Sequence, residues 1–384
     1  MNLSIPKEVF DLMHALEERG FECYIVGGTI RDMLLGNSTH DYDLTTNATP
    51  DDMLEVFQNY TTIPTGIKHG TLTVLTKKYP VEITTYRKDS EYIDHRHPSS
   101  VTFSSSLEED CARRDFTINA LCYNENSGLK DFFSGQLDLE KRIIRCIGNP
   151  EERFEEDALR ILRALRFQTQ LNFVIEENTK QAIFTKKELL RSISLERIHE
   201  ELNGILSHPA KDLFTEYKEV FTIFLPEIQT INDFSALDKE GTPLTRMALL
   251  LRNTSNPKEI LQYMKYSNQD LRSILNYIAY EEFPLDTRIN IKKCMSHILE
   301  DFQDFILYRS ALDSSLDKDL ILSTFQEVID NDECISLSQL DIDGNDLLEL
   351  GYKGKEISEK LNALLESVLE ERIENKKEIL KASL

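Results

Sequence analysis

The sequence YIVGGTIRDMLLGNSTHDYDL, residues 24–44, decides the fold of this chain. It opens with a short apolar run typical of a buried strand, and Gly27 and Gly28 follow at once, where the backbone can turn tightly and expose its N–H groups. Residues 29–35 then have helical character, so the glycine turn opens onto a helix N-terminus, which attracts anions. Arg31 lies one turn into that helix. The pattern predicts a place for phosphate.

An acidic pair follows on the next predicted strand. Residues 40–44 alternate, so Asp41 and Asp43 are expected to point to the same face of that strand. Two carboxylates side by side need a cation, and Mg²⁺ prefers oxygen ligands and substrate phosphates. A glycine pair or a D-x-D motif alone is usually only a turn or a solvated strand edge. In this order, however, the two predict a triphosphate cradle beside a metal site.

This order of elements resembles the first motif of the polymerase beta nucleotidyltransferase superfamily. More narrowly, GGTIRD followed by DYDL resembles the class II (bacterial-type) tRNA nucleotidyltransferases, the CCA-adding enzymes, and the bacterial poly(A) polymerases related to them. The resemblance implies Mg²⁺-dependent nucleotidyl transfer, with Asp41 and Asp43 as catalytic residues and metal ligands. We expect Gly28 and Arg31 to bind the nucleotide.

Length and composition bound the class of protein. The 384 residues suffice for two to four domains, and 40% hydrophobic with 29% charged residues is ordinary for a soluble protein. There is no membrane-length apolar run and no signal-peptide pattern, so we expect a cytoplasmic location and no membrane partner. The six cysteines lack metal spacing and are expected to be reduced core thiols. The net charge of −23 argues against a nucleic-acid partner, but it is an average over the whole molecule. A local strip of basic residues on one face could still bind nucleic acid.

Two further features belong to the predicted head. Residues 70–86 predict a hairpin with Glu82 in its second strand. By resemblance, Glu82 is a candidate third catalytic acid that orients or deprotonates the attacking RNA hydroxyl; the alternative is a surface glutamate on an edge strand. Residues 87–106 are polar and lack periodicity, which predicts a long mobile loop. In the family this position holds the loop required to switch from adding C to adding A, which argues against an enzyme that adds only CC.

The segment RRDFTINAL, residues 113–121, resembles the second motif of the family, which implies that Arg114 binds the nucleotide. Asp115 would orient an arginine or sense the ribose, and Asn119 would offer a neutral hydrogen-bonding side chain. Residues 131–148 resemble the third motif, after which the head ends.

From about residue 150 the pattern becomes helical. Asp157 and Arg160 are three residues apart and thus neighbours on one face of the predicted helix, and Arg163 and Arg166 step along the same side. Such a row is usually a solvated set of ion pairs. EDALR, however, stands where class II enzymes carry E-D-x-x-R, which implies that Asp157 and Arg160 bind the Watson–Crick edge of C or A in place of a template. Arg163 and Arg166 would reach the triphosphate.

The remaining sequence consists of amphipathic helices with two recognisable segments. SLERIHEELNGIL, residues 194–206, resembles the fifth motif, a helix that supports the neck. Near the end, GNDLL and GYKGKEI resemble the C-terminal segment of Gram-positive-type CCA-adding enzymes. The turn at residues 351–354, flanked by basic side chains, is either a grip on phosphate in the tRNA elbow or a connection between helices.

Together these features predict an α+β fold. A polymerase-beta-like nucleotidyltransferase head with a mixed sheet and helices (1–149) precedes a helical neck (150–206), body (207–280) and tRNA-binding tail (281–384). We expect template-independent addition of C, C and A to the tRNA 3′ end from CTP and ATP, with contacts to the acceptor arm and elbow, by a monomer or a homodimer. An enzyme that adds only A, or a poly(A) polymerase, would carry the same motifs. A small-molecule nucleotidyltransferase shares the glycine pair and D-x-D, but EDALR and the long helical tail argue against it.

Overall fold

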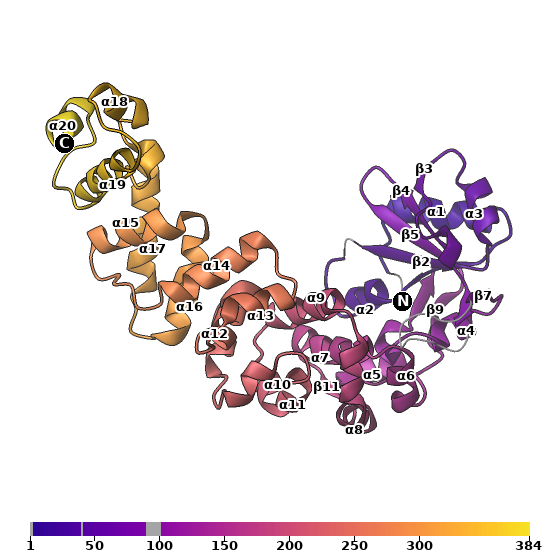
Figure 1. The fold of residues 1–384 in the computed structure, drawn as a ribbon. Helices are drawn as coiled ribbons and strands as arrows, with labels where there is room; N and C mark the ends of the chain where they lie inside the picture. Colours follow the sequence, from indigo (N-terminus) through magenta and orange to yellow (C-terminus); the bar gives the residue numbers. More distant parts are fainter. Residues whose placement is uncertain (1–2, 40, 90–100) are drawn as a thin grey trace. The chain divides into compact units, whose positions relative to one another are not determined.

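The computed structural model describes residues 3–39, 41–89 and 101–384 (Figure 1). Internal contacts divide the chain into two units. Unit 1 comprises Met1–Ile205 and Tyr217–Pro226, and unit 2 comprises Leu206–Glu216 and Glu227–Leu384. Unit 1 therefore holds the predicted head together with nearly all of the predicted neck, and the finer division into four domains stays a prediction.

A mixed sheet organises unit 1. Its strands are β1 (Cys23–Val26), β2 (Tyr42–Thr46), β3 (Thr61–Ile63), β4 (Thr71–Leu75), β5 (Pro80–Thr85), β8 (Cys122–Asn124) and β9 (Gly128–Lys130). Within the described residues these seven strands are ordered β3-β4-β5-β2-β1-β8-β9. β2 and β5 pair in parallel and the other neighbours pair antiparallel, which confirms the predicted mixed sheet.

The central strands place two of the predicted acids, Asp43 and Glu82, on one face. All four residues of β1 are buried between β2 and β8, as expected for the apolar run that opens the motif. β2 begins at Tyr42, so Asp41 lies just before the strand. The parallel register sets Asp43 opposite Glu82, and both side chains are exposed between buried neighbours. The sheet therefore presents these two carboxylates on its solvent-facing side.

Helices pack around this sheet and continue beyond it. Those of unit 1 are α1 (Lys7–Glu17), α2 (Gly28–Leu34), α3 (Pro50–Val56), α4 (Leu107–Ala112), α5 (Gly135–Lys141), α6 (Pro150–Glu156), α7 (Leu159–Leu171), α8 (Glu177–Lys186), α11 (Lys218–Phe221) and nearly all of α9 (Leu195–Leu206). α1 buries Val9, Met13 and Leu16, which recur at helical spacing, whereas Phe10, which that spacing also placed against the sheet, is 36% exposed. α3 begins at Pro50, and Thr49 and Asp52 form a reciprocal hydrogen-bonded cap at its N-terminus.

Two short ladders complete unit 1. β6 (Arg87–Asp89) and β7 (Val101–Phe103) pair antiparallel at the two ends of the predicted loop, whose middle, residues 90–100, lies outside the described residues. β10 (Ile143–Ile144) pairs in parallel with β11 (Val174–Ile175). The sequence pattern did not predict β11, which is too short to show an alternation of its own.

Unit 2 is helical throughout the part that the structure describes. Its helices are α10 (Lys211–Glu216), α12 (Pro243–Leu251), α13 (Pro257–Tyr263), α14 (Asn268–Ala279), α15 (Arg288–Ile298), α16 (Phe302–Leu312), α17 (Lys318–Asp330), α18 (Gly344–Glu349), α19 (Lys355–Leu369) and α20 (Lys377–Ala382). α12 and α13 start at Pro243 and Pro257, because proline suits the first position of a helix. Among the described residues, no helix of either unit is both long and apolar enough to cross a membrane.

Candidate active site

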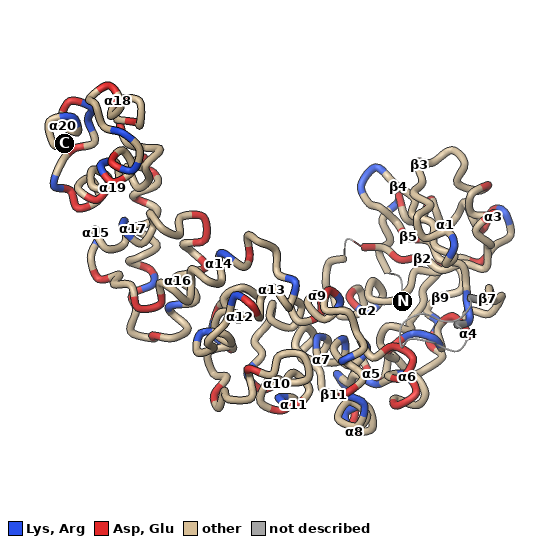
Figure 2. The backbone as a smooth tube through the Cα atoms, in the orientation of Figure 1, with Lys and Arg blue, Asp and Glu red and all other residues tan. Residues whose placement is uncertain are grey.

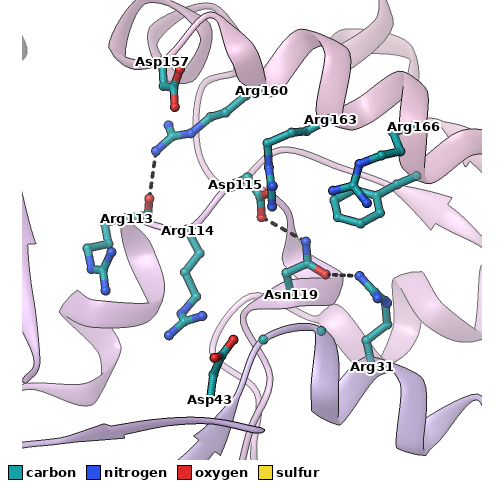
Figure 3. Close-up of a pocket in the computed structure, with 13 residues that line it drawn as sticks. Arg31, Asp43, Arg113, Arg114, Asp115, Asn119, Asp157, Arg160, Arg163 and Arg166 are labelled. Carbon is teal, nitrogen blue, oxygen red and sulfur yellow. Dashed lines mark hydrogen bonds and ion pairs between the residues drawn. The ribbon is translucent and has the colours of Figure 1, made fainter. Parts of the chain in front are cut away.

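A polar pocket of about 410 Å³ lies in unit 1, between the glycine turn and α7 (Figure 3). Its walls are formed by Gly27, Gly28, Arg31, Asp43, Arg113, Arg114, Asp115, Asn119, Asp157, Arg160, Arg163, Arg166 and Phe167. Eight of the predicted site residues meet here, namely Gly28, Arg31, Asp43, Arg114, Asp157, Arg160, Arg163 and Arg166. The other two, Asp41 and Glu82, are exposed and do not line it.

The pocket is basic although the chain is acidic. Six arginines and three aspartates are among its lining residues. Acidic and basic residues are otherwise interspersed along both units, as Figure 2 shows. The net charge of −23 therefore says little about this site, because a local cluster of cations sets the field that a bound anion meets.

The glycine turn allows the backbone to approach the charged groups. Gly27 has φ of 72° and ψ of −141°, a conformation open essentially to glycine alone. A Cβ atom at Gly27 would lie 3.4 Å from Arg114 Nη1 and 3.9 Å from Asp43 Oδ2. The turn thus brings main chain, a cation and a carboxylate together at the start of α2.

The acidic groups are close enough to influence one another. Partial burial raises the pKa of the Asp43 carboxyl, and the charges of Glu82 and Asp41 raise it further, against the lowering effect of Arg114. A divalent cation would relieve this repulsion. In the described residues, no three His, Cys, Asp or Glu side chains converge as a complete metal cage. Asp41 and Asp43 nevertheless fit Mg²⁺, which keeps several waters and is commonly held by one or two carboxylates plus substrate phosphates.

One wall carries two arginines held by a buried carboxylate. Arg113 Nε donates to Asp110 Oδ1 at 2.9 Å, and Arg114 Nη2 donates to Asp110 Oδ2 at 3.3 Å. Burial acts to raise the pKa of Asp110, but the charges of the two arginines outweigh it, so the pKa is lowered. Asp110 therefore stays ionised and fixes Arg114, the residue predicted to bind the nucleotide, beside Asp43 and the glycine turn.

A chain of polar side chains crosses the pocket floor (Figure 3). Arg31 Nη1 donates to Asn119 Oδ1 at 2.8 Å, and Asn119 Nδ2 donates to Asp115 Oδ1 at 3.0 Å. Asp115 Oδ2 accepts from Arg163 Nε at 2.8 Å and from Arg163 Nη2 at 2.7 Å. Burial opposes the charge on Asp115, yet Arg163 and Asn119 lower its pKa to about 2. The second motif thereby links α2 to α7.

Asp157 lies at a break between two helices. α6 ends at Glu156, Asp157 is extended with φ of −141° and ψ of 102°, and α7 begins at Leu159. One continuous helix across EDALR was therefore the wrong prediction. The reason is local: Asp157 Oδ1 accepts the Leu159 N–H at 3.1 Å, a short-range bond that competes with helix propagation. Asp157 Oδ2 accepts from Arg197 Nη2 of α9 at 2.8 Å.

Arg160 is held from three sides. Its Nη1 donates to Glu156 Oε2 at 2.7 Å and to the Arg153 carbonyl at 3.1 Å, and its Nη2 donates to the Arg113 carbonyl at 3.0 Å. The side chain is buried. Arg160 and Asp157 thus line the same pocket with fixed orientations, as the close-up in Figure 3 shows.

Arg166 is oriented by α9. Its Nε donates to Glu201 Oε2 at 2.6 Å, and Glu201 Oε1 lies 3.7 Å from Arg163 Nη1. Glu201, Arg197 and Phe167 were not predicted as site residues. Arg197 and Glu201 lie on one face of the fifth-motif helix, four residues apart, which is the signal that could have found them.

Three segments of the chain match known protein families. Residues 23–145 match the family described as Poly A polymerase head domain. Residues 172–230 match Probable RNA and SrmB- binding site of polymerase A. Residues 238–384 match tRNA nucleotidyltransferase domain 2 putative.

Whole-chain relatives give the same result. The CCA-adding enzyme of Lactobacillus helveticus is 37% identical over 382 residues, covering 95% of this chain and 93% of the relative. The CCA-adding enzyme of Staphylococcus haemolyticus is 34% identical over an alignment that covers 99% of this chain and 98% of the relative. The crystal structure of the Bacillus stearothermophilus CCA-adding enzyme in complex with CTP is 29% identical, with a TM-score of 0.82 over 98% of this chain and 96% of that one. The chain therefore belongs to the family of CCA-adding enzymes.

Proposed function

We propose that this chain adds C, C and A to the 3′ end of tRNA without a nucleic-acid template, using CTP and ATP and releasing pyrophosphate. Membership of the family supports the reaction. The observation that carries the proposal is the pocket itself, which combines a carboxylate beside a glycine turn with Asp157 and Arg160 on the opposite wall. A nucleotide in this pocket would meet an acidic end suited to a metal and an acceptor–donor pair suited to a base.

Asp157 and Arg160 select the base in this proposal. Cytosine and adenine both present an exocyclic amino donor next to a ring-nitrogen acceptor, whereas uracil and guanine present a carbonyl next to an N–H. Ionised Asp157 only accepts and Arg160 only donates, so the pair complements C and A and leaves U and G unsatisfied. The contacts that fix both side chains support this role, because discrimination requires groups that do not reorient for the wrong base.

The other basic residues bind the triphosphate. Arg31, Arg114, Arg163 and Arg166 line the pocket around the glycine turn at Gly28. Planar guanidinium groups suit phosphate oxygens because they donate in a fixed fork. These residues bind any nucleoside triphosphate alike, and selection is left to the base-facing pair.

Asp41 and Asp43 would hold Mg²⁺, which would supply charge stabilisation to the attacking hydroxyl and to the leaving pyrophosphate. The 3′ oxygen of tRNA bonds to the α-phosphorus as the bond from that phosphorus to the pyrophosphate oxygen breaks. Glu82, opposite Asp43 on the neighbouring strand, orients the hydroxyl or accepts its proton. The exposed position of Glu82 supports access for an RNA end.

The remaining assignments extend to the whole chain. We assign residues 1–149 to the catalytic head, 150–206 to the neck, 207–280 to the body and 281–384 to a tail that binds the tRNA elbow while the acceptor arm enters the pocket. The six cysteines are free and buried, which supports the reducing cytoplasm as the site of action. The enzyme works as a monomer or a homodimer.

Incorporation of labelled CTP and ATP into three tRNA transcripts tests the proposal. The transcripts end before CCA, after C and after CC, and the reactions contain Mg²⁺. Extension of all three to the same full-length end is expected. Extension of only the third transcript by one A would identify an A-adding enzyme instead, a long A tail would identify a poly(A) polymerase, and no incorporation would favour a small-molecule nucleotidyltransferase.

A further inference from the structure

The pocket contains one aromatic side chain, Phe167, among the residues that line it. Three guanidinium groups surround its ring. The Cζ atoms of Arg31, Arg163 and Arg166 lie 5.0, 5.4 and 4.6 Å from the ring centroid. Phe167 is 4% exposed, so these contacts are largely shielded from water. All three distances fall within the range in which an aromatic ring attracts a cation.

These three arginines come from different parts of the fold. Arg31 belongs to α2, whereas Arg163 and Arg166 belong to α7, and in Figure 3 they lie together at one side of the pocket, away from Asp157. Like charges this close repel one another, and the repulsion is stronger in a partly dry site than in water. The group remains together only because other groups compensate its charge.

Carboxylates compensate part of that charge and also orient the arginines. Arg163 pairs with Asp115, Arg166 pairs with Glu201, and Arg31 donates to Asp32 and Asn119. Glu201 lies 3.7 Å from Arg163 as well as contacting Arg166, whereas Arg31 has its own polar partners. The ring of Phe167 contacts all three guanidinium groups.

We propose that Phe167 is a positioning residue for the triphosphate: its ring gathers Arg31, Arg163 and Arg166 into one preorganised anion site. The inference rests on the proposed function, because it assigns the polyphosphate to these arginines. Phe167 acts on the part of the nucleotide that CTP and ATP share. Removal of the Phe167 ring should therefore weaken the binding of CTP and of ATP equally and leave the choice of base unchanged.

Packing alone is the competing explanation. Phe167 also contacts Phe116 edge to face, with ring centroids 5.8 Å apart, and a buried aromatic ring stabilises a core whatever surrounds it. The two explanations make different predictions for the binding of a ligand that has phosphates but no base. A positioning role predicts weaker binding of inorganic tripolyphosphate, whereas a packing role predicts a lower thermal midpoint with unchanged affinity in the folded protein.

The test compares Phe167→Leu, which removes the ring, with Phe167→Tyr, which keeps it. Binding of tripolyphosphate to the full chain is measured by isothermal titration calorimetry in Mg²⁺-free buffer, well below the thermal midpoint, so that the metal site does not contribute. We expect about a tenfold higher Kd for Phe167→Leu, equivalent to roughly 1.4 kcal/mol, and a Kd for Phe167→Tyr within about twofold of wild type. The kcat/KM for CTP and for ATP should fall by one common factor in the leucine variant.

Phe173→Leu is the matched control, because Phe173 is 5% exposed and follows the same helix. It should bind tripolyphosphate like wild type. Wild-type affinity in folded Phe167→Leu, equal losses in both leucine variants, or a changed ratio of CTP to ATP use would each overturn the inference. So would a wild-type protein that adds nucleotides without binding tripolyphosphate, whereas failure to add any nucleotide would overturn the proposed function. If Phe167→Leu does not fold, Phe167→Met takes its place with the same expectation.

Discussion

Replacement of Asp115 by Asn removes the charge at the centre of the pocket network while keeping the size of the side chain. Asp115 is 8% exposed and accepts two hydrogen bonds from Arg163. In Asp115→Asn the amide keeps one acceptor oxygen, but Arg163 loses its ion pair and retains the more distant Glu201, at 3.7 Å, and the charge of Asp157. We expect the variant to fold with lower stability.

The pKa of Asp115 gives the magnitude. It falls from its ordinary value of 3.8 to about 2. At 1.36 kcal/mol per unit, the ionised form contributes about 2 kcal/mol to the free energy of unfolding at neutral pH. For a unit of this size, that corresponds to a thermal midpoint about 4 to 8 °C lower in Asp115→Asn.

The dependence on pH follows from the sign of the shift. The pKa of Asp115 is lower in the folded than in the unfolded chain, so its contribution is fully present above about pH 4 and is lost as the pH falls toward about 2. The difference in stability between wild type and Asp115→Asn should therefore stay constant from about pH 5 to 8. This difference in stability should narrow as the pH falls from about 4 to about 2.

Thermal unfolding followed by circular dichroism at several pH values is the assay. Glu188→Gln provides the control, since Glu188 pairs with Arg191 on the exposed surface and such pairs contribute little. Equal midpoints for wild type and Asp115→Asn at pH 7 would refute the reasoning. A difference that widens below pH 4 would refute it equally, because it would place the stabilising charge elsewhere.

Four other predictions concern single residues. Asp43→Ala should abolish nucleotide incorporation without lowering the thermal midpoint, and incorporation at the wild-type rate would remove Asp43 from the metal site. Asp157→Ala should increase misincorporation of U and G more than it weakens tRNA binding, and unchanged discrimination would contradict its role. Arg197→Ala should cause the same defect as Asp157→Ala because the two are hydrogen-bonded, and in a double-mutant cycle the effects should not add. Gly27→Ala should lower the free energy of unfolding, measured in urea, by about 1 to 3 kcal/mol, because alanine would have to adopt the positive φ of Gly27. Wild-type stability of this variant would show that alanine is not strained there.

Local patterns predicted the parts of the site that depend on neighbouring residues. The apolar run before Gly27 and Gly28 is a buried strand, and the next residues form α2. The alternation around Asp43 identified β2, since alternation is a property of the strand itself. The resemblance of RRD and EDALR to family motifs then predicted that distant segments share one pocket, and the structure brings them together.

Partners that are distant in sequence were not predictable in the same way. Asp115 pairs with Arg163 and Arg166 pairs with Glu201 because α7 packs against both the second motif and α9, which no spacing within one segment reveals. The break at Asp157 was also missed. Good helix formers on both sides favoured a continuous helix, but the Asp157 carboxylate accepts a competing hydrogen bond from the Leu159 N–H, and this bond favours the break.

Sequencing of product ends tests the central claim most directly. A tRNA transcript lacking CCA is incubated with the enzyme, Mg²⁺ and all four nucleoside triphosphates at equal concentration, and the 3′ ends are read individually. Selection by Asp157 and Arg160 predicts that nearly every extended end reads CCA, with neither U nor G and no further extension. Ends of mixed sequence, or runs of A, would contradict selection by this pair.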